Sequence, residues 1–153
     1  MKKNTLIIIF ILISLSKANA GQYLLDWYLK GTTFDSILFD DKSSYNLIKG
    51  EGPWEDNKGN FGHLNCIGKT SDINQNLILD MVCKAVDNDG DNFWLKLYRN
   101  SERDAGIGKT TYLKGTGKFI SYNNLDCVYA VNYLKESTKK GRTGFYKQKC
   151  NVN

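Results

Sequence analysis

The sequence predicts an all-β protein: one antiparallel barrel of about eight strands, closed or nearly closed and stapled by disulfides. Short apolar and β-branched runs alternate with turn-forming residues roughly every ten positions, which is typical of an antiparallel barrel or sandwich. A Gly-x-Gly-Lys unit occurs twice, beginning at Gly106 and at Gly115. Four cysteines, at positions 66, 83, 127 and 150, give an even number for disulfide pairing.

The N-terminus has the features of a secretory signal peptide. Two lysines precede an apolar run over residues 6–15, and Ala18 and Ala20 fit the small-x-small rule for cleavage after Ala20. The run is well short of the roughly 20 apolar residues that a membrane-spanning helix needs. Residues 1–20 are therefore a predicted cleaved signal, and residues 21–153 are a predicted single domain, secreted or periplasmic. No membrane insertion is expected after cleavage.

The charge of the chain lies largely in this signal. Removing Lys2, Lys3 and Lys17 lowers the formal net charge from +5 to +2. A chain so close to balance lacks the electrostatic signature of nucleic-acid binding, so we expect no nucleic-acid partner.

The predicted strands follow one another along the mature chain. Residues 23–29 fit either a strand or a short helix, and residues 50–62 form the longest irregular stretch. Asp89-Gly90 is a strong signal for a tight hairpin turn. At most one or two short helices are expected, near residues 21–33 or in a loop. The segments richest in apolar, β-branched and aromatic residues are 34–39, 45–49, 64–69, 77–86, 93–99, 127–134 and 144–150.

The repeated glycines predict a corner of the barrel over residues 106–119. Glycine at every second position leaves one face of a strand without side chains, which permits a tight bend or close approach of another backbone. Gly108-Lys109-Thr110 also looks like the end of a phosphate-binding loop. The first glycine of that motif would fall on Arg103, and no helix is expected after it, so we reject a nucleotide site.

The cysteines predict two disulfides. The chain has no C-x-x-C pair, so a metal site built on cysteine is disfavoured. If the runs on either side of residues 70–76 pair antiparallel, Cys66 falls nearly opposite Cys83. Cys127 falls opposite Cys150 in the same way, across the loop at 135–143. Opposed positions lie within disulfide reach, so we expect Cys66–Cys83 and Cys127–Cys150.

One acidic turn is a weak candidate for calcium. Asp87, Asp89 and Asp91 alternate around Gly90, and carboxylate oxygens are the ligands that calcium prefers. An EF-hand loop would place glycine sixth and a glutamate at position 98, which is Tyr98. A solvated hairpin turn is the favoured interpretation. We expect no metal and no cofactor.

Five residues are candidates for ligand binding: Trp54, Asp56, His63, Arg99 and Lys109. Long ordered loops on a rigid sheet are where binding residues concentrate, so we expect residues 54–63 and 99–109 to meet at one barrel end. In the structural alternative, Trp54 plugs that end and Asp56 caps a turn. His63, the only histidine, is expected to be an ordinary strand residue rather than a general base.

A set of motif residues carries a family resemblance over about two-thirds of residues 21–153: Trp54, Asp56, Asn57, Gly59, Asn60, Gly62, Cys66, Gly68, Cys83, Asp87, Asp89, Gly90, Asp91, Trp94, Arg99, Ala105, Gly106, Gly108, Lys109, 115–119, Cys127 and Tyr129. In these residues the chain resembles a family of small secreted bacterial proteins of unknown function. Residues 115–119 are also similar to the G-T-G-[KR]-[FY] strand of calycin-like, allene oxide cyclase-like and dirigent barrels. Those barrels usually have a glycine where this chain has Ser121. The resemblance implies a fold and no activity.

The expected role is binding by a monomer. The strand aromatics Trp94, Tyr129 and Tyr133 are expected in the core, yet an eight-stranded barrel can also hold one small ligand. The partner is therefore a small molecule in the barrel or a protein at its rim. Alternatives are a cyclase- or isomerase-type enzyme working in the lumen and a secreted hydrolase inhibitor. No catalytic motif decides whether the chain is an enzyme. An enclosed apolar lumen with a convergent Glu, Arg or Asn favours a ligand carrier or enzyme.

Overall fold

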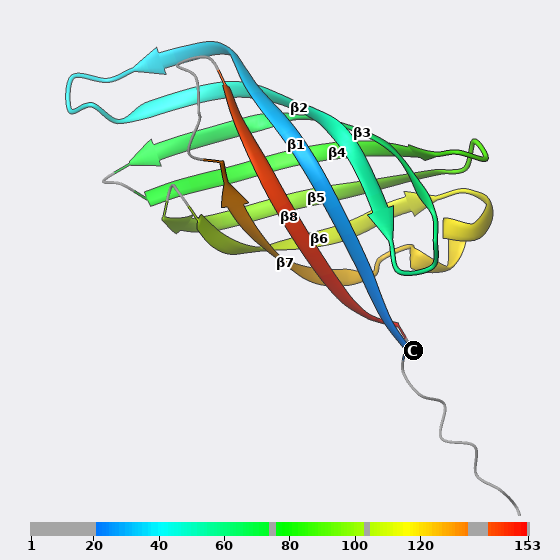
Figure 1. The fold of residues 1–153 in the computed structure, drawn as a ribbon. Helices are drawn as coiled ribbons and strands as arrows, with labels where there is room; N and C mark the ends of the chain where they lie inside the picture. Colours follow the sequence, from blue (N-terminus) through cyan, green and yellow to red (C-terminus); the bar gives the residue numbers. More distant parts are fainter. Residues whose placement is uncertain (1–20, 74–75, 103–104, 135–140, 153) are drawn as a thin grey trace, which may run out of the picture.

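A computed structural model describes residues 21–152 except 74–75, 103–104 and 135–140. The predicted signal peptide, residues 1–20, lies outside the described residues. The fold is a closed antiparallel barrel in which each strand pairs with the next and β1 also pairs with β8 (Figure 1). The strands are β1 Gly21–Leu38, β2 Ser44–Asp56, β3 Phe61–Ile73, β4 Asn76–Asp87, β5 Asn92–Glu102, β6 Ala105–Gly115, β7 Asp126–Tyr133 and β8 Gly141–Val152. The predicted fold class is confirmed.

Alternation of side chains explains why the ambiguous N-terminal segment is a strand. Tyr23, Leu25, Trp27 and Leu29 of β1 are buried in the barrel, whereas the intervening Leu24 and Tyr28 are 40% and 48% exposed. A period of two fits a sheet with one face inside and one outside, and no helix would bury every second residue.

The stretch predicted to be irregular, residues 50–62, is two strands and a tight turn. β2 continues to Asp56 and β3 begins at Phe61. The glycines and turn-forming polar residues of this segment suggested a loop, but Gly52 is required by close packing. A Cβ on Gly52 would collide with the carbonyl oxygen of Tyr28 in the neighbouring strand.

The second glycine unit lies at a corner, as predicted, but is not a strand. Gly115 ends β6, and a 3₁₀ helix, η1, spans Gly117–Tyr122. Gly117 has φ +47°, a conformation that favours glycine. A Cβ on Gly115 would strike the carbonyl of Phe119, so the chain turns back on itself here and folds over the barrel end.

Both predicted disulfides are present. Cys66 lies directly opposite Cys83 and Cys127 directly opposite Cys150, with Cα–Cα distances of 4.0 and 4.5 Å. All four cysteines are buried in the lumen. The two bonds fit an oxidising, extracytoplasmic location. Within the described part of the chain, no helix is both long and apolar enough to cross a membrane.

The two ends of the barrel differ. At the plugged end, where the β2–β3 and β4–β5 turns and η1 lie, buried rings pack edge-on, for example Trp54 with Phe93 at 5.0 Å between centroids. At the open end the β1–β2 hairpin projects beyond the other strands (Figure 1). We call the buried rings of the closed end the aromatic plug: Tyr23, Trp54, Phe93, Tyr112, Phe119 and Tyr122.

One predicted core aromatic lies outside. Trp94 is half-buried on the outer face of β5, with the ammonium groups of Lys84 and Lys114 at 5.7 and 5.9 Å from its ring centroid. Tyr129 is 1% exposed inside the barrel, as predicted, and Tyr133 is half-buried. Trp94 was misassigned because β5 carries large side chains on both faces, so its sequence shows no alternation of apolar and polar residues that would indicate which face is buried.

Candidate functional site

The structure separates the five predicted site residues. Trp54 and Asp56 lie at the plugged end, whereas Arg99 lies toward the open end, where β5 finishes. The prediction that residues 54–63 and 99–109 meet at one end is therefore wrong. In an antiparallel meander successive turns alternate between ends. The β2–β3 turn and the β5–β6 turn are three apart, so they lie at opposite ends.

Trp54 and Asp56 fit the structural alternative. Trp54 is 2% exposed and also meets the ring of Phe119, at 6.0 Å between centroids. Asp56 Oδ1 accepts hydrogen bonds from the backbone N–H groups of Lys58 and Asn60, both at 2.9 Å. The carboxylate thus holds a tight turn, which is the ordinary use of aspartate in such a position.

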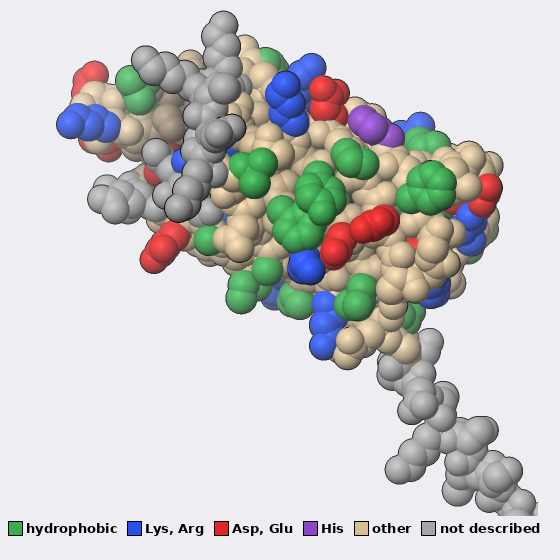
Figure 2. Space-filling model, in the orientation of Figure 1, with side chains coloured by type: hydrophobic (Ala, Val, Ile, Leu, Met, Phe, Trp, Pro, Cys, Tyr) green, Lys and Arg blue, Asp and Glu red, His purple; other side chains and the backbone are tan. Residues whose placement is uncertain are grey.

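His63 and Lys109 point away from the lumen. His63 is exposed on β3, with its Nδ1 3.3 Å from the side-chain amide of Asn65. It is the one purple side chain on the face that Figure 2 shows. Lys109 is exposed on the outer face of β6. Neither residue joins the others in a site.

A lysine occupies the candidate calcium turn. Asp87 Oδ1 accepts the N–H groups of Asp89 and Asp91, at 2.9 and 2.8 Å. The Lys118 ammonium lies 2.8 Å from Asp87 Oδ2, as an ion pair, and donates to Asp89 Oδ2 at 2.6 Å. Burial alone would raise the pKa of Asp87, but Lys118 and the two N–H groups outweigh it and lower that pKa below its usual range. Across the described residues no cluster suited to a metal ion is found.

The open end contains a cavity that the sequence did not locate. Its volume is about 330 Å³, at the low end of the roughly 300–1,000 Å³ typical of small-molecule sites. The side of the cavity formed by β7 and β8 is polar, with Tyr133, Arg142 and Tyr146, and we call it the polar wall. The side formed by β1 to β4 is mixed: Leu29, Ile48, Leu77 and Met81 line it together with Thr32, Thr33, Ser44, Asn46, Lys49, Thr70 and Asp72. Such a lining suits a small molecule that has both apolar and polar groups.

Next to the cavity lies a buried arginine, Arg99, which contacts the lining residue Tyr133. Arg99 is 1% exposed, and its Nη2 donates to Tyr133 Oη at 3.2 Å. Its guanidinium carbon lies 5.5 Å from the centroid of the Tyr133 ring. Nε and Nη1 make no hydrogen bond, and no ion pair joins Arg99 to a carboxylate within the described ranges. Arginine is charged at physiological pH, so this is a buried charge without a counter-charge there.

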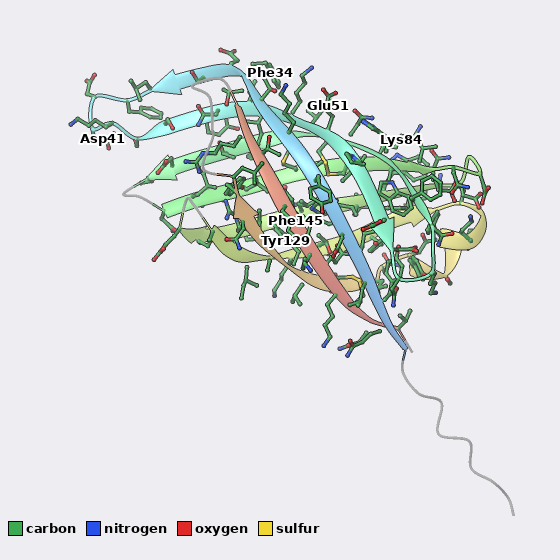
Figure 3. All side chains as sticks on the ribbon, in the orientation of Figure 1. Phe34, Asp41, Glu51, Lys84, Tyr129 and Phe145 are labelled. Carbon is green, nitrogen blue, oxygen red and sulfur yellow. A yellow bond between two sulfur atoms is a disulfide. The ribbon has the colours of Figure 1, made fainter. Side chains whose placement is uncertain are left out.

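The first glycine unit makes room for this arginine and for a tyrosine. A Cβ on Gly108 would overlap the ring of Tyr129, which lies inside the barrel (Figure 3). A Cβ on Gly106 would strike Ser101 and come within 3.2 Å of Arg99 Nη1. The bare face of β6 that the sequence predicts is thus filled by a phenol ring and a guanidinium.

Tyr129 and Tyr146, which lie near Arg99, remain neutral at physiological pH. Burial raises the pKa of Tyr129 well above its ordinary value, and the nearby Arg99 offsets only part of that rise. Burial likewise raises the pKa of Tyr146, with a further contribution from Tyr133. Tyr129 Oη is buried and has no hydrogen-bond partner among the described residues. These hydroxyls can donate hydrogen bonds but cannot supply a negative charge for Arg99.

A second arginine lies on the same ring. The guanidinium carbon of Arg142, from β8, is 5.4 Å from the Tyr133 ring centroid. Two guanidinium groups therefore contact one phenol ring beside the cavity. Sequence analysis missed Tyr133, Tyr146 and Arg142 as site residues, because their proximity depends on the pairing of β7 with β8 and on which faces point inward.

Comparison of the sequence with models of known protein families and with functionally characterised proteins finds no match. The site itself is therefore the basis for a functional conclusion.

Proposed function

We propose that the mature chain is a secreted or periplasmic binding protein that holds a small molecule in the open-end cavity. The single observation that carries this proposal is the asymmetry of the lumen. Aromatic side chains fill one end of the barrel, whereas the other end holds a cavity of about 330 Å³ that both apolar and polar side chains line. A lumen filled throughout by side chains would have left only the outer surface for binding.

The character of the outer surface supports a monomer that binds its ligand inside the barrel. On the face over β1 and β8, hydrophobic, acidic and basic side chains are interspersed (Figure 2). There the tilted rings of Tyr28 and Phe145 lie with their centroids 4.6 Å apart, and Asp26 forms an ion pair with Lys147. In this proposal the chain acts as a monomer, because pairing of β1 with β8 closes the sheet. The relation to calycin-like barrels remains a prediction.

Native mass spectrometry tests the proposal, with two variants of neighbouring residues in β2. Protein secreted by its producing cells is expected to retain a small molecule. Ile48→Trp, which fills the cavity from its wall, is expected to lose the added mass. Leu47→Trp, the matched control on the outer face, is expected to keep it. Absence of added mass in the wild type, or equal retention by both variants, would contradict binding in this cavity.

A further inference from the structure

We propose that the molecule bound in the open-end cavity carries a carboxylate, recognised by Arg142 and Tyr133 at the polar wall with the buried Arg99 behind them. This inference rests on the proposed function and adds the chemical class of the ligand. It begins from Arg99, whose charge has no counter-charge in the described structure.

A buried arginine without a carboxylate partner is costly to folding. Moving a charge out of water carries a penalty of several kcal/mol that a well-placed opposite charge must offset. Arg99 is 1% exposed, and two of its three guanidinium nitrogens make no hydrogen bond within the part of the chain that the structure describes. Its partners are the Tyr133 hydroxyl and the face of the Tyr133 ring. Unsatisfied buried donors are rare in native proteins, so each one calls for a function or an absent partner.

Arg99 is linked to the cavity through Tyr133. Because Tyr133 Oη accepts a hydrogen bond from Arg99 Nη2, its own proton is left to donate elsewhere. Tyr133 and Tyr146 both line the cavity. Hydrogen bonds in a chain polarise one another, so a charged donor behind Tyr133 makes its hydroxyl a stronger donor to an anion.

The charges at the cavity also favour an anion. Arg142 lines the cavity from β8, and the buried Arg99 contacts Tyr133 of the same wall. Lys49 and Asp72 also line the cavity, from β2 and β3. The formal charges of these four side chains sum to +2. An anionic ligand would offset part of that positive charge.

A carboxylate matches the hydrogen-bond donors of this site. Its two oxygens match the paired N–H groups of a guanidinium and also accept hydrogen bonds from phenol hydroxyls. Elsewhere in the lining, Leu29, Ile48, Leu77 and Met81 offer apolar contact to a short hydrocarbon body. A small carboxylic acid with an aliphatic chain can contact both these residues and the polar wall.

Isothermal titration calorimetry with octanoate, octanamide and octan-1-ol tests the inference. The three probes share their apolar chain, and only octanoate is an anion. We expect the wild type to bind octanoate about tenfold to a hundredfold more tightly than octanamide, the usual gain from a hydrogen bond to a charged group. Arg99→Met and Arg142→Met should each reduce this preference toward unity. Lys109→Met, which removes a positive charge from the outer face, should leave it unchanged.

The stability of Arg99→Met gives a second readout. If Arg99 has a structural role, the Arg99→Met variant should have a lower melting temperature than the wild type. If Arg99 is an uncompensated buried charge, its removal is expected to leave the melting temperature unchanged or to raise it. Should this variant not fold, the structural role of Arg99 is established and the inference is wrong. Tyr133→Phe, which removes only the hydroxyl, is expected to weaken octanoate binding more than octanol binding.

Other outcomes separate this inference from the proposed function. If octanamide binds as tightly as octanoate, or if Arg99→Met keeps the preference, the cavity binds a ligand but not through its carboxylate. If a neutral molecule co-purifies with the protein, the proposed function stands and the inference is overturned. If none of the three probes binds, the inference is overturned, and the native mass spectrum alone decides the proposed function.

Discussion

Replacing each of two tryptophans by alanine tests the assignment of the plugged end. Trp54 is 2% exposed and contacts two rings of the aromatic plug, at 5.0 and 6.0 Å. Truncating a buried aromatic residue costs about 3–5 kcal/mol, and each ring pair adds about 0.5–1.5 kcal/mol beyond area burial. The indole Nε1–H of Trp54 has no hydrogen-bond partner in the described structure, so its removal also removes a desolvation penalty and lowers the net loss of stability. We expect Trp54→Ala to lose about 4 kcal/mol.

The same substitution outside the barrel is the control. Trp94 is half-buried on the outer face, where its contacts are lysine ammonium groups near 6 Å. Trp94→Ala is expected to lose only about 1 kcal/mol. Urea unfolding followed by far-UV circular dichroism, with the disulfides intact, measures both values. A Trp54→Ala variant as stable as Trp94→Ala would refute the account of the plug. Loss of octanoate binding by a folded Trp54→Ala variant would place the ligand at the wrong end.

Two further predictions concern the turn at Asp87 and a glycine in β2. Lys118→Met should move acid unfolding to higher pH. Because the pKa of Asp87 is lowered in the folded protein, its carboxylate stabilises the fold above about pH 4, and this stabilisation is lost as the pH falls. Removing the Lys118 ammonium raises that pKa, so the loss begins at a higher pH. Acid unfolding followed by circular dichroism measures the midpoint, and an unshifted midpoint would contradict this. Gly52→Ala should lower the free energy of unfolding in urea by more than about 1 kcal/mol, because the added Cβ meets the Tyr28 carbonyl. Gly21→Ala is the control and should change little, since nothing lies within 4 Å of its Cβ position. Equal effects of the two substitutions would refute the packing argument.

Local sequence signals were sufficient for the architecture. Alternating apolar runs predicted the barrel, and cysteines at opposed positions predicted both disulfides. Each of these features depends on pairing between two consecutive strands, so it can be predicted once the turn between them is located. The Asp89-Gly90 turn joins β4 to β5 as expected, with Gly90 at φ +91°.

The site was harder to predict because it depends on long-range placement. The prediction treated residues 50–62 as one loop and so missed the β2–β3 turn within it. Successive turns alternate between the two ends of the barrel, so without this turn Trp54 and Arg99 were placed at the same end. The cavity residues come from β1, β2, β3, β4, β7 and β8, which no local pattern groups together. One signal was present but misread. The sequence interpretation placed a corner of the barrel at the bare glycine face over Gly106 and Gly108, whereas these residues lie within strand β6 and the free space is taken by side chains that include Tyr129 and Arg99.

The most direct test of small-molecule binding at the open end uses a single methyl group. Methionine occurs only at positions 1 and 81, so a mature chain labelled with ¹³C at the methionine ε-methyl gives one resonance, from Met81 in the cavity wall. Titration with octanoate is expected to shift this resonance saturably in the wild type and in Leu47→Trp, and to leave it unmoved in Ile48→Trp. A Met81 resonance that stays in place in the wild type while octanoate binds would contradict binding in the open-end cavity.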